Sequence, residues 1–368
     1  MRKTQVIINK SALRRNLEFI QSQCKNHEKI IAIVKANAYG HGAVVIARIL
    51  SQEGIDGFGV AYTEEGVILR NAGIKEPIII LVQQSEEDIP EIVDYNLQPA
   101  VSSIEFLSKL NEEAAKYNKI IKVHLFIDTG MSRDGITAEE AVDFVAETKD
   151  MRNIKFEGIC THFSSASLDP VITHHQLDKF NYAIDSLKAA GTEFNLIHAA
   201  SSAASINFPE ARFNAVRPGI VLYGYPPDDQ IAYRYNIKPI LSLKSNISLL
   251  RRIKAGDSVS YSRKFIADRD TTIATVPIGY GDGYIRSLSG KASCIIHNKM
   301  YPIVGAICMD ELMVNIGDDK LNIGDPVILI GETSSCSVSA YDLANFAGTI
   351  PYEITTLIAP RVPRIYVN

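Results

Sequence analysis

Eight short runs rich in β-branched residues alternate with longer amphipathic segments between residues 28 and 225, and this alternation constrains the fold most strongly. The segments at 43–52 and 176–189 carry apolar residues at helical spacing. Repeated strand–helix units predict a parallel sheet, and eight of them favour a (β/α)8 TIM-type barrel over an open doubly wound sheet. The strand candidates are 30–36, 57–62, 77–83, 98–102, 122–128, 155–162, 195–199 and 215–223.

The pattern changes after about residue 229. Strand-like runs now follow one another with turns between them, at 240–250, 272–278, 292–297, 301–306, 312–316 and 326–330. The sequence therefore predicts a barrel over 1–229 and a C-terminal, mostly antiparallel β domain over 230–368. The early run 5–9 alternates apolar and polar residues, and we expect it to lie outside the barrel and to pair with the second domain.

Composition excludes several classes of protein. The chain has 368 residues, 46% of them hydrophobic, and a formal net charge of −4, which offers no field for binding nucleic acid. Neither a secretion signal nor a membrane span is expected, because the apolar runs are short. The five cysteines are scattered without a metal-binding spacing, so we expect a cytoplasmic protein in a reducing compartment with no metal site.

In a barrel of this type, catalytic residues follow the carboxyl ends of the strands. Lys35 ends the first predicted strand, where loss of solvation would lower its pKa and make it an amine nucleophile for Schiff-base chemistry. The alternative to this catalytic role is that Lys35 extends its charged amine to solvent at the rim of the barrel. His162 ends the sixth strand, where a hydrogen-bonded core histidine is the alternative to a catalyst.

The DTG triplet at 128–130 does not indicate an aspartic protease, because that site needs two matched carboxylates. Arg133 nearby is a candidate fork for a substrate carboxylate, with a surface ion pair as the alternative. Ser202 and Gly219 follow the last two strands, where such barrels bind phosphate, although either could belong to a plain loop. A strand-end lysine with a phosphate site suggests a pyridoxal-phosphate enzyme or an aldolase. In the second domain, Tyr261 and the segments 278–284 and 308–310 stand out only by composition.

The segment VKANAYGHG at 34–42 resembles the pyridoxal-phosphate attachment motif of the alanine racemase family. The resemblance continues in family order along nearly the whole chain, with DTGM at 128–131, THF at 161–163, VRPGI at 216–220, CMD at 308–310, IPYE at 350–353 and RVPR at 361–364. It implies a barrel followed by a β domain, pyridoxal 5'-phosphate as cofactor, and a head-to-tail homodimer with composite active sites.

The resemblance also implies roles for particular residues. Lys35 would hold the cofactor and act as the base on one face of the substrate, and the partner subunit's Tyr261 would act on the other face. Arg217 would face the pyridine nitrogen, and His162 would bridge Arg217 and Tyr261. Arg133 and the partner subunit's Met309 would orient the substrate carboxylate and the phenolic oxygen side. The phosphate would be held by Tyr39, Ser202, Gly219, Ile220 and Tyr352.

Two positions depart from the family pattern. Phe126 stands where many members have a carbamylated lysine, so we expect Arg133 to be held differently, for example by a bound anion. Ala306 replaces an arginine, which would remove charge from the entrance to the site. The leading interpretation is a racemase that interconverts L- and D-alanine and supplies D-alanine for peptidoglycan. The alternatives are a serine or broad-specificity amino-acid racemase and a non-catalytic cofactor-carrier barrel.

Overall fold

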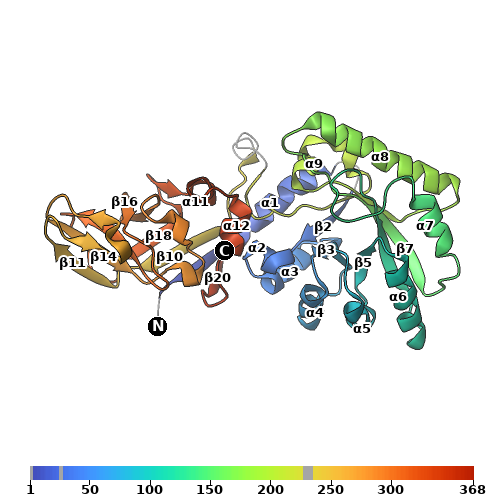
Figure 1. Ribbon diagram of the computed structural model, residues 1–368, viewed down its shortest axis with the longest axis horizontal. Coiled ribbons are helices and arrows are strands. Elements are labelled where there is room, and N and C mark those ends of the chain that lie inside the picture. The colour runs from blue at the N-terminus through green and yellow to red at the C-terminus, as the bar shows by residue number, and fades with distance from the viewer. Residues whose placement is uncertain (1–2, 25–27, 227–234) are drawn as a thin grey trace. The chain divides into compact units, whose positions relative to one another are not determined.

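The computed structural model describes residues 3–24, 28–226 and 235–368. The chain divides into two compact units (Figure 1). The barrel unit contains residues 13–38 and 43–238, and the sheet unit contains residues 1–12, 39–42 and 239–368. The domain boundary predicted at residue 229 lies outside the described residues.

In the described part of the barrel unit, eight parallel strands form one sheet in the order β8-β7-β6-β5-β4-β3-β2-β9. A parallel bridge between Ser201 and Arg217 joins the two ends of this sheet. The structure therefore confirms the predicted TIM-type barrel. The strands are β2 (Lys29–Ile33), β3 (Gly57–Val60), β4 (Ile78–Ile80), β5 (Gln98–Val101), β6 (Ile121–Phe126), β7 (Ile154–Cys160), β8 (Leu196–His198) and β9 (Ala215–Val216).

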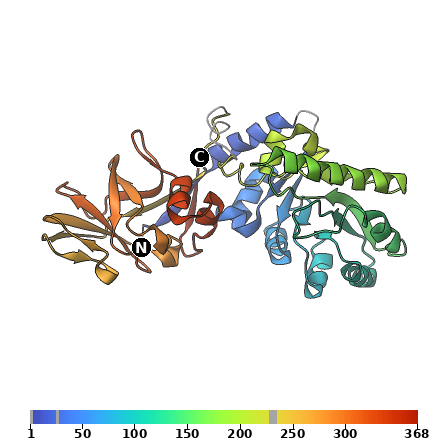
Figure 2. The same cartoon turned by 45° about the horizontal axis from the view of Figure 1, so that its top comes forward.

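Apolar side chains on both faces of the strands explain why the barrel forms. Ile31, Ile79, Leu196 and Ala215 pack together as one buried cluster. The helices of the repeats lie on the outer side of the strands (Figure 2). They are α1 (Lys10–Gln23), α3 (Ala43–Gln52), α4 (Thr63–Asn71), α5 (Ile89–Asp94), α6 (Ile104–Lys116), α7 (Ala141–Glu147), α8 (Pro170–Ala189) and α9 (Ser202–Asn207).

Most predicted elements of the barrel have slightly different bounds, and three of the differences have a clear structural setting. The first strand, predicted over 30–36, ends at Ile33 because the chain enters a left-handed turn two residues later. The last strand, predicted over 215–223, ends at Val216, and its apolar continuation is buried in turns. The helix predicted from 176 begins at Pro170, where the Asp169 side chain accepts a hydrogen bond from the Ile172 N–H at 3.1 Å.

The sheet unit is built around one large sheet in which β1 pairs with β20 in parallel and the remaining neighbours are antiparallel. This confirms the predicted mostly antiparallel C-terminal part. β1 also pairs with β10. The main strands are β1 (Gln5–Asn9), β10 (Leu241–Asn246), β11 (Leu249–Ile253), β14 (Thr271–Val276), β15 (Ser293–Ile296), β16 (Lys299–Val304), β17 (Leu312–Gly317), β18 (Pro326–Glu332) and β20 (Arg364–Val367).

Short elements complete the sheet unit. The strand predicted over 240–250 is two strands, β10 and β11, which are separated by the buried Ile247. Two small helices lie near the C-terminal end of the chain, α11 (Ala340–Ala347) and α12 (Pro351–Thr356). Within residues 3–24, 28–226 and 235–368, no helix is both long and apolar enough to cross a membrane.

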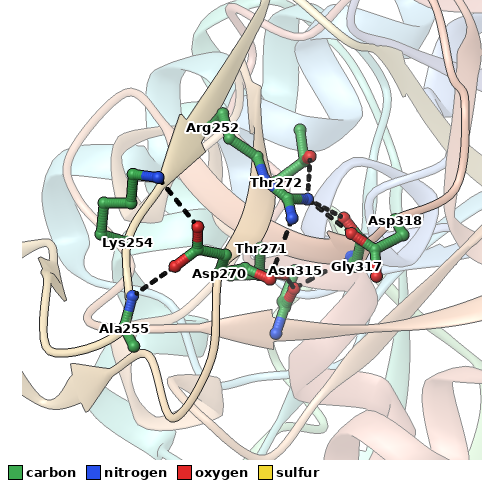
Figure 3. Close-up of polar contacts among 9 residues, drawn as sticks. All are labelled: Arg252, Lys254, Ala255, Asp270, Thr271, Thr272, Asn315, Gly317 and Asp318. Atoms are coloured by element: carbon green, nitrogen blue, oxygen red, sulfur yellow. Dashed lines mark hydrogen bonds and ion pairs between the residues drawn. The ribbon is translucent and has the colours of Figure 1, made fainter.

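A polar cluster joins β11, β14 and β17 at one edge of the large sheet (Figure 3). Arg252 donates to Asp318 Oδ1 at 2.6 Å and to Thr272 Oγ1 at 3.3 Å. Lys254 forms an ion pair with Asp270 at 3.0 Å. These side chains are largely exposed, so each pair adds little stability, about 0–1 kcal/mol, and the cluster serves to align neighbouring strands.

Candidate active site

Lys35 begins a left-handed turn at the carboxyl end of β2. The next residues, Ala36, Asn37, Ala38 and Tyr39, have φ values of 49°, 54°, 54° and 53°. Left-handed conformation costs roughly 1–2 kcal/mol per non-glycine residue, so surrounding contacts must stabilise this turn. One such contact is the hydrogen bond from the Ala38 N–H to the Val34 carbonyl oxygen at 2.8 Å.

The Lys35 amine lies in an environment that favours its neutral form. Burial is the largest cause that lowers the pKa of Lys35 below 10.5, and Arg133 and Arg217 lower it further. Glu65 acts in the opposite direction and raises this pKa. The structure thus places a desolvated amine at the carboxyl ends of the barrel strands, which is the environment that makes a lysine nucleophilic.

Arg217 is buried directly after β9, with a 4% exposed fraction. Its Nη1 atom lies 2.8 Å from His198 Nδ1, and its Nη2 donates to the Thr161 carbonyl oxygen at 2.6 Å and to the Ala199 carbonyl oxygen at 3.2 Å. His162 Nδ1 lies 3.4 Å from the same Nη2 atom. Histidine rings and backbone carbonyls therefore orient the guanidinium in the described structure.

A buried chain of side chains continues from Arg217 across the barrel. His198 Nε2 lies 2.9 Å from His124 Nδ1, and His124 Nε2 lies 3.1 Å from Gln98 Oε1. A guanidinium can only donate, so His198 must accept at Nδ1 and carry its proton on Nε2. The same logic assigns the proton of His124 to Nε2, which donates to Gln98. Burial lowers the pKa of His124 to about 3 and that of His198 well below 6.5, so both rings are neutral.

The sequence analysis missed Gln98, His124 and His198. A detectable signal was present, because each is a polar residue in a short strand whose other residues are mostly apolar. Such residues require a hydrogen-bonding partner. His162, which was predicted, lies in the same region, and burial followed by the charges of Arg217, Arg133 and Lys35 lowers its pKa to about 3.

Ser202 and Gly219 are brought together after β8 and β9. Ser202 Oγ accepts a hydrogen bond from the Gly219 N–H at 2.9 Å and one from the Val221 N–H at 3.4 Å. Ile220 lies between Gly219 and Val221 in the sequence and is 3% exposed. A hydroxyl group and backbone N–H groups thus converge at the end of the barrel, and groups of this kind bind phosphate oxygens.

Arg133 is contacted by its neighbour Asp134. Arg133 Nε lies 3.0 Å from Asp134 Oδ2, in an ion pair of the kind that the sequence analysis gave as the alternative, although it did not name Asp134. The loop before it is ordered by Asp128 Oδ1, which accepts hydrogen bonds from three successive backbone N–H groups, beginning with Gly130 at 2.8 Å. Phe126 packs in an apolar cluster with Ala100 and Cys160. The chain itself thus supplies a carboxylate for Arg133, where we expected a bound anion.

Within the sheet unit, Tyr39 and Tyr352 lie side by side, with ring centroids 5.9 Å apart. Burial raises the pKa of the Tyr352 phenol. Gly40 follows with a φ of +85°, and a Cβ atom there would lie 2.1 Å from the Thr355 carbonyl oxygen. This close approach requires glycine and explains Gly40 of the 34–42 motif.

Tyr261 and Met309 lie on neighbouring loops of the sheet unit and are 68% and 53% exposed. The loops meet at Ser260, whose Oγ donates to the Ala306 carbonyl oxygen at 2.6 Å and lies 3.5 Å from Cys308 Sγ. Ala306 is fully buried, so an arginine at this position would have to displace its neighbours. The predicted effect of Ala306 on an entrance stays a prediction.

The glycine-rich segment 278–284, which had no predicted role, supports the Met309 loop. The Gly281 N–H donates to the Met309 carbonyl oxygen at 2.8 Å. Arg361 links the two segments, because its Nε donates to Asp282 at 2.7 Å and its Nη2 donates to Asp310 at 2.8 Å. In the described residues, no group of three or more His, Cys, Asp or Glu side chains could hold a metal ion.

A parallel barrel with a desolvated lysine, a buried arginine and converging backbone N–H groups at its strand ends defines the chain as a barrel enzyme. Residues 8–227 match the family model described as the alanine racemase N-terminal domain, and residues 240–366 match the alanine racemase C-terminal domain. The chain therefore belongs to the alanine racemase family and is an isomerase.

Individual relatives agree with this assignment. The chain is 42% identical to an alanine racemase of Treponema denticola over 376 residues, covering 100% of this chain and 99% of the relative. It is 40% identical to alanine racemase 1 of Clostridium acetobutylicum, covering 94% and 91%. Among solved structures, the alanine racemase of Clostridium difficile 630 is similar, with a TM-score of 0.94, 37% identity and coverage of 99% and 95%.

Proposed function

We propose that the protein interconverts L- and D-alanine with pyridoxal 5'-phosphate as its cofactor. The observation that carries this proposal is the desolvated Lys35 amine, which the barrel unit combines with the buried Arg217. The barrel part, over 1–229, would bind the cofactor, and the part over 230–368 would supply the second catalytic group. The protein would act in the cytoplasm, and its product D-alanine would be used for peptidoglycan.

The residues present fit this cofactor. Lys35 offers an amine for its aldehyde and Arg217 a permanent donor for its ring nitrogen. Ser202 offers its hydroxyl hydrogen to the phosphate, and Gly219, whose N–H donates to Ser202 Oγ, would lie beside it. Ile220, Tyr39 and Tyr352 would complete the phosphate site. When bound, pyridoxal phosphate withdraws electrons from the substrate α-carbon and acidifies its hydrogen.

Racemisation needs two proton-transfer groups, because a proton removed from one face must be replaced on the opposite face. We assign Lys35 Nζ to one face and the phenol oxygen of the partner subunit's Tyr261 to the other. The exposure of Tyr261 supports a role toward a second chain of a homodimer, because it leaves the phenol free to reach one. His162 is neutral, and its Nδ1 atom lies 3.4 Å from Arg217 Nη2. Its ring would form a hydrogen bond with that phenol, as acceptor or as donor.

Arg217 would hold its place without moving a proton, since a guanidinium does not release one at neutral pH. Arg133 would bind the substrate carboxylate, because Asp134 contacts its Nε and leaves the two Nη atoms available for a fork. The partner subunit's Met309 would lie on the substrate side. The proposed substrate is thus a small amino acid with a free carboxylate.

One observation favours a second candidate, a racemase of serine or of several amino acids. Phe126 lies in an apolar cluster at the position where the family resemblance implies a carbamylated lysine, and Asp134 contacts Arg133 instead. Turnover of single L-amino acids, followed by chiral chromatography, separates the two candidates. A carrier protein without turnover is disfavoured by the sheet unit and its exposed Tyr261.

Borohydride reduction of the protein with pyridoxal phosphate tests the cofactor assignment. The label should fix to the peptide that contains Lys35. Lys122 and Lys155 are the internal controls, because their amines form ion pairs with Glu157 at 3.2 Å and 3.1 Å. A label on either control instead of Lys35 would overturn the assignment.

A further inference from the structure

Glu65 contacts the turn that begins at Lys35, although no sequence pattern singled it out. β2 and β3 are parallel neighbours, with Ile33 opposite Gly59, so their carboxyl ends lie together. Glu65 is in the first turn of α4, the helix that follows β3. This topology brings a half-buried carboxylate from one repeat to the lysine turn of the preceding repeat.

The carboxylate of Glu65 accepts hydrogen bonds from backbone donors of both repeats. Oε1 accepts from the Ala36 N–H at 2.5 Å. Oε2 accepts from the Ala61 N–H at 2.7 Å and from the Tyr62 N–H at 3.4 Å. One side chain therefore ties the residue after Lys35 to the end of the adjacent strand. Hydrogen bonds of this type, from N–H groups to a carboxylate, are stronger than neutral ones.

The contact lies at the end of the turn nearest to Lys35. The other end is held separately, because Asn37 Oδ1 accepts a hydrogen bond from the Ala43 N–H at 2.8 Å. Loss of the Glu65 carboxylate would therefore release the first residues of a strained left-handed segment and leave the later ones anchored. The direction of the Lys35 side chain depends on those first residues.

Charge gives Glu65 a second effect on the same lysine. Arg133 and Arg217 lower the pKa of Lys35 in addition to burial, whereas Glu65 raises it. Glu65 is thus an acidic neighbour that acts against the two cations, with a smaller effect on this pKa than Arg133 has. This effect of charge acts on the amine of Lys35, the residue directly before the Ala36 N–H that Glu65 contacts.

We propose that Glu65 is a positioning residue for Lys35, which fixes the lysine turn through the Ala36 N–H and balances the positive charge around the amine. This inference rests on the proposed function only in assigning the cofactor to Lys35. The gain for the enzyme is preorganisation, because an amine held in one direction loses less conformational freedom when it binds its partner.

The matched variants are Glu65→Gln, Glu65→Ala and Glu64→Gln. Glu64 is the exposed preceding residue of α4, so its change removes the same charge outside the contact. Glu65→Gln keeps one oxygen acceptor and the side-chain size, and it carries the test if Glu65→Ala does not fold. Hydrogen exchange in the cofactor-free protein should become faster in the peptide that spans residues 35–39 for both Glu65 variants and stay unchanged for Glu64→Gln.

The second measurement is association of pyridoxal phosphate with the cofactor-free protein as a function of pH. The affinity should fall roughly ten- to a hundred-fold in Glu65→Gln, as expected for loss of a charged hydrogen-bond acceptor. The pH midpoint of association should move down, because the anion that raises the pKa of Lys35 is gone. Wild-type exchange rates in Glu65→Gln, or an unchanged midpoint, would overturn the proposal.

These outcomes are separable from failure of the proposed function. If borohydride labels a lysine other than Lys35 in the wild-type protein, the proposed function fails, while hydrogen exchange still decides whether Glu65 holds the turn. If Lys35 is labelled but the Glu65 variants behave like Glu64→Gln, the proposed function stands and this inference is wrong.

Discussion

The Nη1 atom of Arg217 lies 2.8 Å from Nδ1 of His198, and both side chains are buried where β9 and β8 end. Because the arginine can only donate, this contact fixes the direction of every hydrogen bond from Arg217 through His198 and His124 to Gln98. These hydrogen bonds hold the positive charge of Arg217 in the core, although none of the four side chains is a carboxylate. It also makes stability dependent on neutral histidines.

Stability should therefore fall with acid. The pKa values of His124 and His162 are about 3 in the folded protein, below an unfolded value near 6.5, so the unfolded state binds more protons. The stabilisation is present above pH 6.5 and is lost as pH falls toward 3, by up to about 1.4 kcal/mol per pH unit for each buried histidine. Denaturant titrations between about pH 5 and about pH 7.5, which lie on either side of the unfolded histidine pKa, measure how steeply the free energy of unfolding changes with pH.

A variant assigns the slope to the buried chain. His124→Gln removes one titrating ring, so its free energy of unfolding should change less steeply with pH than that of the wild type. His175→Gln is the control, because His175 is exposed on α8. Equal slopes for wild type and His124→Gln would contradict a neutral buried His124.

Loss of the Asp134 carboxylate should weaken substrate binding. In Asp134→Asn, Arg133 loses a charged partner and its fork samples more directions, so we expect KM for L-alanine to rise several-fold, about 1 kcal/mol, with a smaller change in kcat. Steady-state kinetics test this, with the exposed Asp143→Asn on α7 as control. A KM that stays at the wild-type value would exclude Asp134 from substrate positioning.

Added bicarbonate should leave the activity unchanged. A carbamate forms on a lysine amine, and Phe126 offers none at this position, where it packs against Ala100 and Cys160. Turnover measured in carbon dioxide-free buffer and after addition of bicarbonate should therefore agree. Activation by bicarbonate, together with a mass increase on a lysine peptide, would show that another residue takes this role.

The sequence predicted the barrel because strands buried on both faces read as continuous apolar runs, and it singled out Lys35 because a charged residue stands out at a strand end. Arg217 was assigned a role only through the family resemblance. Strand ends were less accurate. The run 30–36 looks like one strand, but it includes the left-handed turn at Ala36, whose N–H donates to the Glu65 carboxylate from the next repeat. No local pattern encodes that contact.

Long-range partners explain the other residues that were missed. His124, His198 and Gln98 come from three strands and acquire a role only when the barrel brings them together. Asp134 was overlooked because an acidic residue beside an arginine is common on protein surfaces. The structural role of the glycine segment 278–284 likewise depends on a distant residue, because Arg361 near the end of the chain donates to Asp282 in this segment.

Supply of the two proposed bases by different chains is the central claim, and complementation tests it most directly. Lys35→Ala and Tyr261→Ala should each be nearly inactive as homodimers. In a mixed dimer, one site combines an intact Lys35 with an intact Tyr261 and the other site carries both lesions. Co-refolding equal amounts should therefore restore roughly a quarter of wild-type activity, since about half of the dimers are mixed. No recovery, with mixed dimers confirmed by mass, would place both bases in one chain and contradict the account.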